Sequence, residues 1–167
     1  MKSHTISVLV ENRAGVLSRV AGMFSRRGFN IESLAVGTCE EPDMSRITIV
    51  VNGDGSVVEQ VMKQTNKLID VIKVSDLTER ESVERELALI KVAAEPGTSR
   101  AEILQIADIF RAQVVDVGAK TLVLQVAGDT DKIDALEKLL RQYGIKELVR
   151  TGKIAILRGA KTVKSSK

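Results

Sequence analysis

Residues 10–36 decide the fold of this chain, and they read Val10-Glu-Asn-Arg-Ala-Gly-Val-Leu-Ser-Arg-Val-Ala-Gly-Met-Phe-Ser-Arg-Arg-Gly-Phe-Asn-Ile-Glu-Ser-Leu-Ala-Val36. The stretch contains the end of a strand, a helix that begins at Gly15, a stop at Gly28 and the start of a second strand. The apolar positions of the helix recur at helical spacing: Leu17, Val20, Ala21 and Phe24. A helix that begins directly after a strand leaves its first backbone N–H groups unpaired, so it can bind a small anion such as an amino-acid carboxylate.

The pattern around this stretch predicts a β-α-β-β-α-β order for the first half of the chain. We expect strands at residues 5–11, 31–38, 45–52 and 70–76. A second helix follows Gly53-Asp-Gly-Ser56, with Asp54 or Ser56 as its cap. In residues 5–11 strict alternation gives the strand one apolar face. This order is the ferredoxin-like plan, in which two helices pack on one face of an antiparallel sheet.

The same order recurs in the second half, so we predict an α+β protein with two diverged ferredoxin-like βαββαβ domains in tandem. The expected helix caps are Ser99 for the first helix and Asp129 or Thr130 for the second. The predicted strands lie at residues 86–94, 113–117, 121–127, 145–150 and 154–157. The predicted domains are residues 1–78 and 86–159, joined by a charged linker at 79–85. Residues 160–167 are polar and basic, and we expect them to be disordered.

The composition favours a soluble cytoplasmic protein. The chain has 167 residues, a formal charge of +3 and an apolar share of 44%. No apolar run reaches the length of a membrane helix, and a strand pattern is established by Thr5, so we expect no leader peptide and no membrane partner. Cys39, the single cysteine, fits a reducing compartment. Aromatic residues are absent from the predicted strands, which argues against a nucleic-acid partner.

Little in the sequence suggests catalysis or metal binding. The chain has one histidine, His4, which we place on the surface and which has no second histidine nearby. Three carboxylates crowd the turn at Glu40, Glu41 and Asp43. A solvated hairpin tip is the favoured interpretation, and an adventitious divalent cation is the alternative. We therefore predict no catalytic residue and no metal site.

The loop at residues 12–17 is the main candidate for binding. Gly15 lets a ligand approach the backbone, and the N–H groups of Gly15, Val16 and Leu17 could hold a carboxylate. The Asn12 side chain can both accept and donate, which suits a zwitterion. The structural alternative is an asparagine helix cap followed by a tight-turn glycine. Asn30 lies at the turn from helix to strand, where a structural role explains it equally well.

Two segments of this region resemble the small regulatory subunit of acetohydroxyacid synthase (acetolactate synthase): Glu11-Asn-Arg-Ala-Gly-Val-Leu-Ser-Arg-Val20 and Arg26-Arg-Gly-Phe-Asn-Ile-Glu-Ser-Leu34. The similarity continues through Asp70-Val-Ile-Lys-Val-Ser-Asp-Leu77, Val83-Glu-Arg-Glu-Leu87 and Phe110-Arg-Ala-Gln-Val-Val-Asp-Val117, so it covers essentially the whole chain. In that family the N-terminal domain is an ACT domain, a ferredoxin-like module that binds amino acids.

The resemblance implies an effector site shared between two ACT domains. Asn12, Ala14, Gly15, Val16 and Leu17 of one chain would face Asn30 and Ile31 of its partner in a homodimer. The strand at residues 31–38 carries only Glu32 as a charge, so its edge is poorly protected against pairing with a second copy.

The resemblance also implies a catalytic large subunit as the partner. That subunit would hold thiamine diphosphate, Mg²⁺ and FAD and condense two pyruvates, or pyruvate with 2-oxobutanoate. This chain would bind none of those cofactors. It would activate the large subunit and confer feedback inhibition by valine or a related branched-chain amino acid. The alternative is a stand-alone ACT-type amino-acid sensor, which would need an output domain that residues 77–167 do not suggest.

Overall fold

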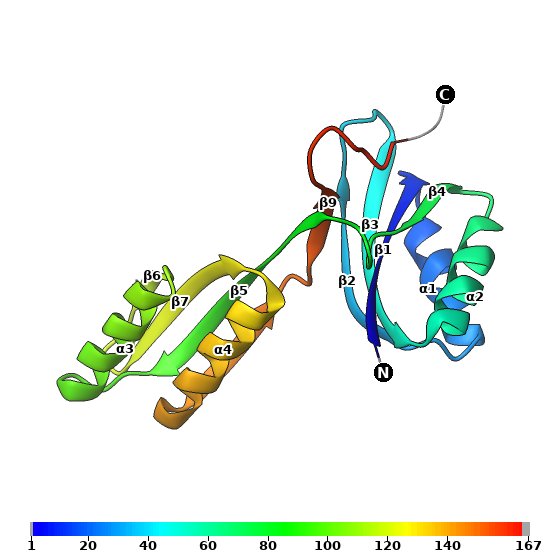
Figure 1. Cartoon of the computed structure of the whole chain (residues 1–167). Helices are drawn as coiled ribbons and strands as arrows, with labels where there is room; N and C mark the ends of the chain where they lie inside the picture. Colours follow the sequence, from blue (N-terminus) through cyan, green and yellow to red (C-terminus); the bar gives the residue numbers. More distant parts are fainter. Residues whose placement is uncertain (1, 165–167) are drawn as a thin grey trace. The chain divides into compact units, whose positions relative to one another are not determined.

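The computed structural model describes residues 2–164, and the chain divides into two compact units. Unit 1 consists of Met1–Val83 together with Lys153–Lys167, and unit 2 consists of Glu84–Gly152. The chain therefore leaves unit 1, builds unit 2 and returns (Figure 1). Among the helices of the described residues, none is long and apolar enough to cross a membrane.

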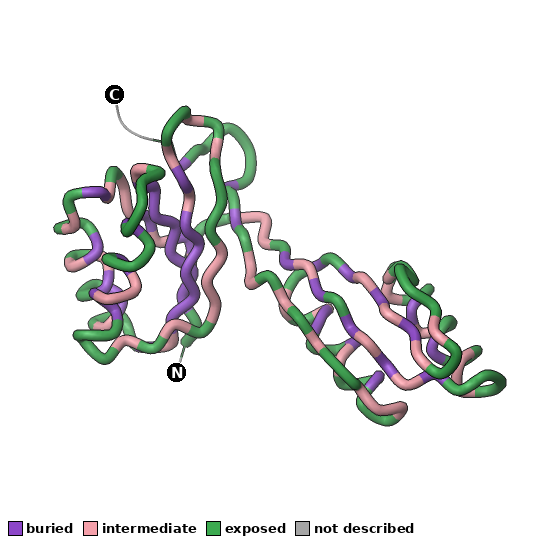
Figure 2. The backbone as a smooth tube through the Cα atoms, turned by 180° about the vertical axis from the view of Figure 1, so that it is seen from behind, coloured by how far each residue is buried: buried purple, intermediate pink, exposed green. Residues whose placement is uncertain are grey.

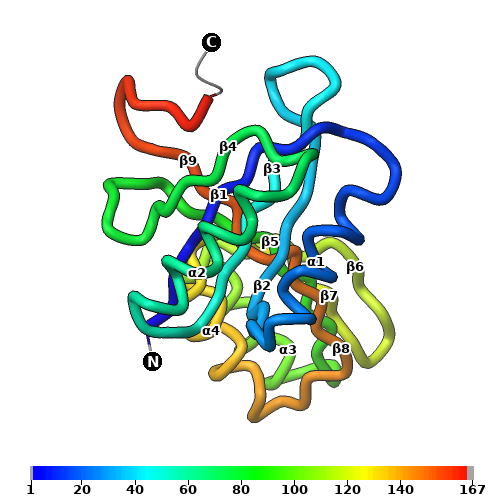
Figure 3. Tube along the Cα trace, turned by 90° about the vertical axis from the view of Figure 1, so that its right-hand side faces the viewer, coloured from blue at the N-terminus to red at the C-terminus, as the bar shows by residue number. Residues whose placement is uncertain are grey.

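Unit 1 has the predicted ferredoxin-like order. Its elements are β1 (Lys2–Glu11), α1 (Val16–Arg26), β2 (Ile31–Thr38), β3 (Met44–Gly53), α2 (Gly55–Asn66) and β4 (Val71–Asp76). The sheet order is β2-β3-β1-β4, with antiparallel neighbours throughout. Since β1 and β2 both run antiparallel to β3, they point in the same direction. Helices α1 and α2 lie together on one side of this sheet (Figure 3).

The apolar spacing of the sequence explains the core between these helices and the sheet. Val20 and Phe24 of α1 belong to the same core cluster as Ile6 and Val8 of β1, and all four are buried. Phe29 adds an edge-to-face contact to Phe24, with ring centroids 6.1 Å apart. Helix α2 begins as predicted at Asp54, whose carboxylate accepts the first N–H groups of the helix.

Unit 2 repeats the plan. Its elements are β5 (Ser82–Ala93), α3 (Thr98–Ile109), β6 (Gln113–Val117), β7 (Thr121–Gly128), α4 (Thr130–Leu140), η1 (Arg141–Tyr143) and β8 (Ile145–Arg150). The sheet order is β6-β7-β5-β8, with α3 and α4 as its helices. Asp129 caps α4 as predicted. The N-cap of α3 is Gly97 rather than Ser99, because the Ser99 hydroxyl donates back to the Glu95 carbonyl from inside the first turn. The tandem ferredoxin-like prediction is confirmed.

The last part of the chain covers the helix-free face of the unit 1 sheet. We call residues 153–164 the covering segment; it includes β9 (Ile154–Leu157), which pairs with β5. Arg46 and Lys73 lie directly opposite Leu9 on the two neighbouring strands, so the three side chains share a face. Arg46 donates to the Val163 carbonyl at 3.1 Å, and Lys73 donates to the Lys164 carbonyl at 2.8 Å. The covering segment therefore crosses above Leu9, which is fully buried.

The covering segment also buries the second face of β1. Its residues are buried without interruption from His4 to Val10, whereas burial alternates along β7 (Figure 2). The prediction of one buried face for this strand is thus incomplete, because Leu77, Ala155, Leu157 and Val163 form a second apolar cluster in unit 1. His4 is buried, so the prediction that it lies on the surface is wrong. Strand β1 begins at Lys2 and pairs with β3 as far as Gly53, which places His4 within the sheet.

Three sequence-based boundaries differ from the structure. The predicted linker at 79–85 ends early, since β5 begins at Ser82. The predicted second domain, 86–159, includes β9, which the structure groups with unit 1. The prediction of a disordered tail at 160–167 is wrong for residues 160–164, because Val163 is only 6% exposed and both it and Lys164 accept hydrogen bonds. Residues 165–167 lie outside the described residues.

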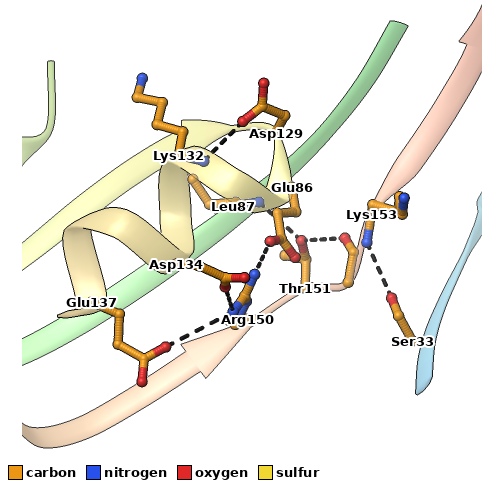
Figure 4. A network of polar contacts seen from close by, with 11 residues as sticks. Ser33, Glu86, Leu87, Asp129, Lys132, Asp134, Glu137, Arg150, Thr151 and Lys153 are labelled. Carbon is orange, nitrogen blue, oxygen red and sulfur yellow. Dashed lines mark hydrogen bonds and ion pairs between the residues drawn. The ribbon is translucent and has the colours of Figure 1, made fainter. Parts of the chain in front are cut away.

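Unit 2 is held by a polar cluster where α4 meets β5 and β8. The guanidinium of Arg150 donates to the buried Glu86 carboxylate and, at 2.6 Å, to Asp134 of α4 (Figure 4). Glu137 lies 3.9 Å away on the next helical turn. One arginine therefore fixes α4 to both strands.

Candidate functional site

The loop between β1 and α1 has the conformation that an anion site needs. Gly15 is the N-cap of α1 with φ 83°, in the left-handed region, and no side chain caps the helix. The Asn12 backbone N–H donates to the Asp43 carbonyl at 2.8 Å, which holds the loop against the turn before β3. Asn12 therefore does not cap α1, so the structural alternative for this asparagine is wrong. Its side chain is exposed.

Unpaired backbone N–H groups are present at the start of α1. In the described part of the chain, no acceptor is found for the N–H of Gly15, Leu17 or Ser18, and that of Val16 makes only a long contact of 3.4 Å to the Arg13 carbonyl. Two of the three predicted groups are thus free, and Ser18 adds one that the sequence analysis did not name. Together with the positive end of the helix dipole they favour a carboxylate at this position.

Arg19 is a residue of the site that sequence reasoning missed. Its Nε donates to Asp70 at 2.6 Å, and the Asp70 side chain is almost fully buried. The same guanidinium lies next to Gly15, because a Cβ on that glycine would stand 3.1 Å from Arg19 Nη1. The signal available in the sequence was the spacing of four residues between Gly15 and Arg19, which puts both on one face of the helix start.

Asn30 and Ile31 lie at the other end of α1. The 11 residues of this helix separate them from the loop at 12–17 by about 16 Å. Asn30 is exposed, while Ile31 is half-buried and pairs with Val51 in the sheet. The left-handed turn before them is taken by Gly28 with φ 68°, so Asn30 needs no unusual backbone angle. Within one chain, the predicted site residues therefore form two separate groups.

Strand β2 lies at an edge of the unit 1 sheet, as the sequence analysis predicted. Its last residues, Val36, Gly37 and Thr38, are exposed. Ser33 accepts a hydrogen bond from the Lys153 backbone N–H at 3.2 Å, where the covering segment begins (Figure 4). The outer backbone of β2 has no neighbouring strand among residues 2–164.

The acidic turn before β3 is largely occupied by contacts within the chain. Glu40 pairs with Arg46 at 3.4 Å, and the Asp43 carbonyl is bound by Asn12. No group of three or more histidine, cysteine or acidic side chains that could hold a metal ion is found among the residues that the structure describes. The cation alternative for this turn gains no support.

Comparison with known families gives two matches that together span most of the chain. The family described as "AHAS small subunit-like ACT domain" matches residues 6–73, and that described as "Small subunit of acetolactate synthase" matches residues 85–159. The first match contains the loop at residues 12–17 and both Asn30 and Ile31.

Individual relatives agree with these families. A probable acetolactate synthase small subunit from Archaeoglobus fulgidus is 63% identical over 158 residues, which is 95% of this chain and 98% of the relative. The acetolactate synthase small subunit of Mycolicibacterium smegmatis is 50% identical over 99% of this chain and 96% of its own length. The crystal structure of a small subunit from Thermotoga maritima superposes with a TM-score of 0.87 at 40% identity, covering 96% of this chain and 100% of that one.

Proposed function

Since this chain belongs to the family of acetolactate synthase small subunits, we propose that it activates a catalytic large subunit and makes that subunit sensitive to valine. The large subunit would supply thiamine diphosphate, Mg²⁺ and FAD, and this chain would supply the effector site. The observation that carries the proposal is the set of free N–H groups at Gly15, Leu17 and Ser18, at the start of an uncapped helix.

The strand directions explain how two chains would complete the site. Because β1 and β2 point the same way, the loop at 12–17 lies at the end of β2 and Asn30 lies at its beginning. If two β2 edges pair antiparallel about a two-fold axis, the beginning of β2 in one chain lies opposite the end of β2 in the other. Asn30 and Ile31 of one chain then come to the loop of the partner. Each dimer has two such sites.

A branched-chain amino acid fits the chemistry of this arrangement. Its carboxylate would accept from the free N–H groups at the start of α1, each charge-assisted bond contributing about 1.5–3 kcal/mol. Its ammonium would donate to the side-chain oxygens of Asn12 and of the partner's Asn30. Leu17, which is exposed in the single chain, and Ile31 of the partner would supply apolar walls.

Regulation then follows from linkage. Valine bound across the two chains favours the arrangement of the dimer that brings loop and β2 together, and the large subunit would prefer another arrangement. The coupling between valine and large-subunit activity is the difference between those two preferences.

The first test is direct. Valine is titrated into the purified chain by calorimetry, and acetolactate formation by the cognate large subunit is measured with and without valine. We expect binding, a rate increase with the chain alone and a decrease when valine is added. An unchanged rate in both conditions would contradict the proposal and favour a stand-alone sensor.

Two variants locate the site. Gly15→Asp places a carboxylate where the effector carboxylate would lie, so valine binding should be lost while activation is kept. Gly159→Asp is the control for backbone strain, because Gly159 likewise has a left-handed φ, 67°, and a Cβ added there would meet no atom within 4 Å. Normal valine affinity in Gly15→Asp would move the site elsewhere.

A mixing experiment tests whether the site is shared. Asn30→Ala and Gly15→Asp should each abolish valine binding alone. In a mixed dimer one of the two sites combines an intact loop with an intact Asn30, so an equal mixture should recover about a quarter of the wild-type sites. A site within one chain would recover none.

A further inference from the structure

A hollow on the helix side of unit 1 is separate from the loop at residues 12–17. It has a volume of about 410 Å³ and lies between the second half of α1 and the end of α2. Its lining residues are Met23, Arg26, Arg27, Gln64, Lys67 and Leu68. Met23 is buried and Leu68 is half-buried, and both belong to or pack against the core of unit 1. The floor of the hollow is therefore apolar.

The rim of the hollow is positive and unneutralised. Arg26, Arg27 and Lys67 form no ion pair with any residue from 2 to 164, and no carboxylate lines the hollow. Other cations of the same helices are paired: Arg19 with Asp70, and Lys63 with Glu59, both at 2.6 Å. The negative ends of the two helix dipoles favour cations at these positions. That effect does not account for the apolar floor that the cations surround.

Ile69 is the next residue of the chain after the hollow, although it does not line the hollow itself. It directly follows Leu68 at the turn between α2 and β4, and at 91% exposed it is the most exposed large hydrophobic side chain of the described residues. A small anion would bind to the cations of the rim but would gain nothing from contact with Ile69 or with the apolar floor. A protein surface that brings carboxylates around an apolar side chain would use all three.

We propose that this hollow, together with Ile69, is a docking surface for the acetolactate synthase large subunit, and that the docking segment of the large subunit carries carboxylates around an apolar side chain. The proposal rests on the proposed function. It also gives the effector a route to the partner, since α1 presents its beginning to valine and its second half to the large subunit.

The test measures the affinity of the full-length chain for the cognate large subunit by calorimetry at low and at high NaCl. The variants are Arg26→Glu with Arg27→Glu, and Ile69→Asp. The matched control is Lys138→Glu with Lys146→Glu in unit 2, since both lysines are exposed and form no ion pair among the described residues. Circular dichroism melting verifies the fold. If the double glutamate variant melts below the assay temperature, Arg26→Gln with Arg27→Gln replaces it.

We expect the arginine variant and Ile69→Asp, here called the hollow variants, each to bind the large subunit at least about tenfold more weakly at low salt. The affinity of the control should stay within about twofold of wild type. The difference for the arginine pair should shrink at high salt, whereas that for Ile69→Asp should persist. Equal binding by the hollow variants and the control would overturn this inference and leave the proposed function standing. Weakening by the charge variants alone, with Ile69→Asp unchanged, would also overturn it. Failure of the wild-type chain to bind would overturn both.

Discussion

The two sheets of this protein share one topology, but the helix-free face is buried in unit 1 and partly exposed in unit 2. In unit 1 that face carries small polar side chains such as Thr5, Ser7 and Thr48, yet it is buried. In unit 2 the corresponding face carries Leu89 and Val149, yet these are 40% and 55% exposed and line a hollow of about 210 Å³. The difference shows that burial here depends on which face receives another segment of the chain, and less on side-chain polarity.

Removal of residues 153–167 should produce the largest effect, because it takes the cover from unit 1. Losing the burial of Leu157 and Val163 alone should lower the free energy of unfolding of unit 1 by about 3–6 kcal/mol. The sequence has one tyrosine, Tyr143, and no tryptophan, so tyrosine fluorescence reports on unit 2 while circular dichroism reports on both units. We expect the circular dichroism transition to shift and the fluorescence transition to stay. Coincident, unshifted transitions would show that the cover contributes nothing.

A matched pair of leucines tests the comparison at single residues. Leu9→Ala removes a fully buried side chain beneath the covering segment and should cost about 2–5 kcal/mol. Leu89→Ala makes the same change on the open face of unit 2, and we expect it to cost less than about 1 kcal/mol. Urea denaturation of both variants measures the difference. Equal costs would mean that the face of unit 2 is also covered in solution, for example by another chain.

Removing an ion pair from the polar cluster of unit 2 should have an intermediate effect on stability. Glu86→Ala leaves Arg150 without its buried partner and should cost about 2–3 kcal/mol, seen in the tyrosine transition. Asp134→Ala is the control, because that carboxylate is mostly exposed and contributes at most about 1 kcal/mol. If both variants were equally stable, the buried pair would not hold α4 on the sheet.

The smallest expected effect concerns a helix cap in unit 2. Asp129 accepts the Lys132 N–H at 2.9 Å, so Asp129→Ala should cost about 1 kcal/mol. Asp129→Asn keeps an acceptor and should cost much less. The pair is measured by thermal unfolding with tyrosine fluorescence. A comparable loss for the asparagine variant would point to the charge of Asp129 instead of its hydrogen bond.

The elements themselves could be predicted from local pattern. Strands β2, β6 and β8 have the predicted bounds, because β-branched runs and flanking glycines mark them in the sequence. Asp54 and Asp129 were recognisable as caps for the same local reason. The start of α3 was missed because Ser99 and Gly97 are both acceptable caps, and the choice depends on where the chain leaves β5.

The covering segment could not be predicted, since its burial depends on contacts distant in sequence. Val163 is a single apolar residue in a polar stretch, and its carbonyl is held by Arg46, 117 residues earlier. The candidate site was predictable only in part, because one of its residues also depends on a contact distant in sequence. The loop at 12–17 has a local glycine signal, whereas Arg19 enters the site through Asp70, whose burial no local pattern reveals.

The passage of the chain out of unit 1 and back has a consequence for biosynthesis. Residues 84–152 leave the ribosome as a continuous piece and can fold as soon as they emerge, while the sheet of unit 1 must wait for residues 153–164 to close its second face. Unit 1, although most of it is translated first, would thus be the last to mature. A truncated chain released after residue 152 should protect unit 2 from proteolysis while unit 1 is still readily cleaved.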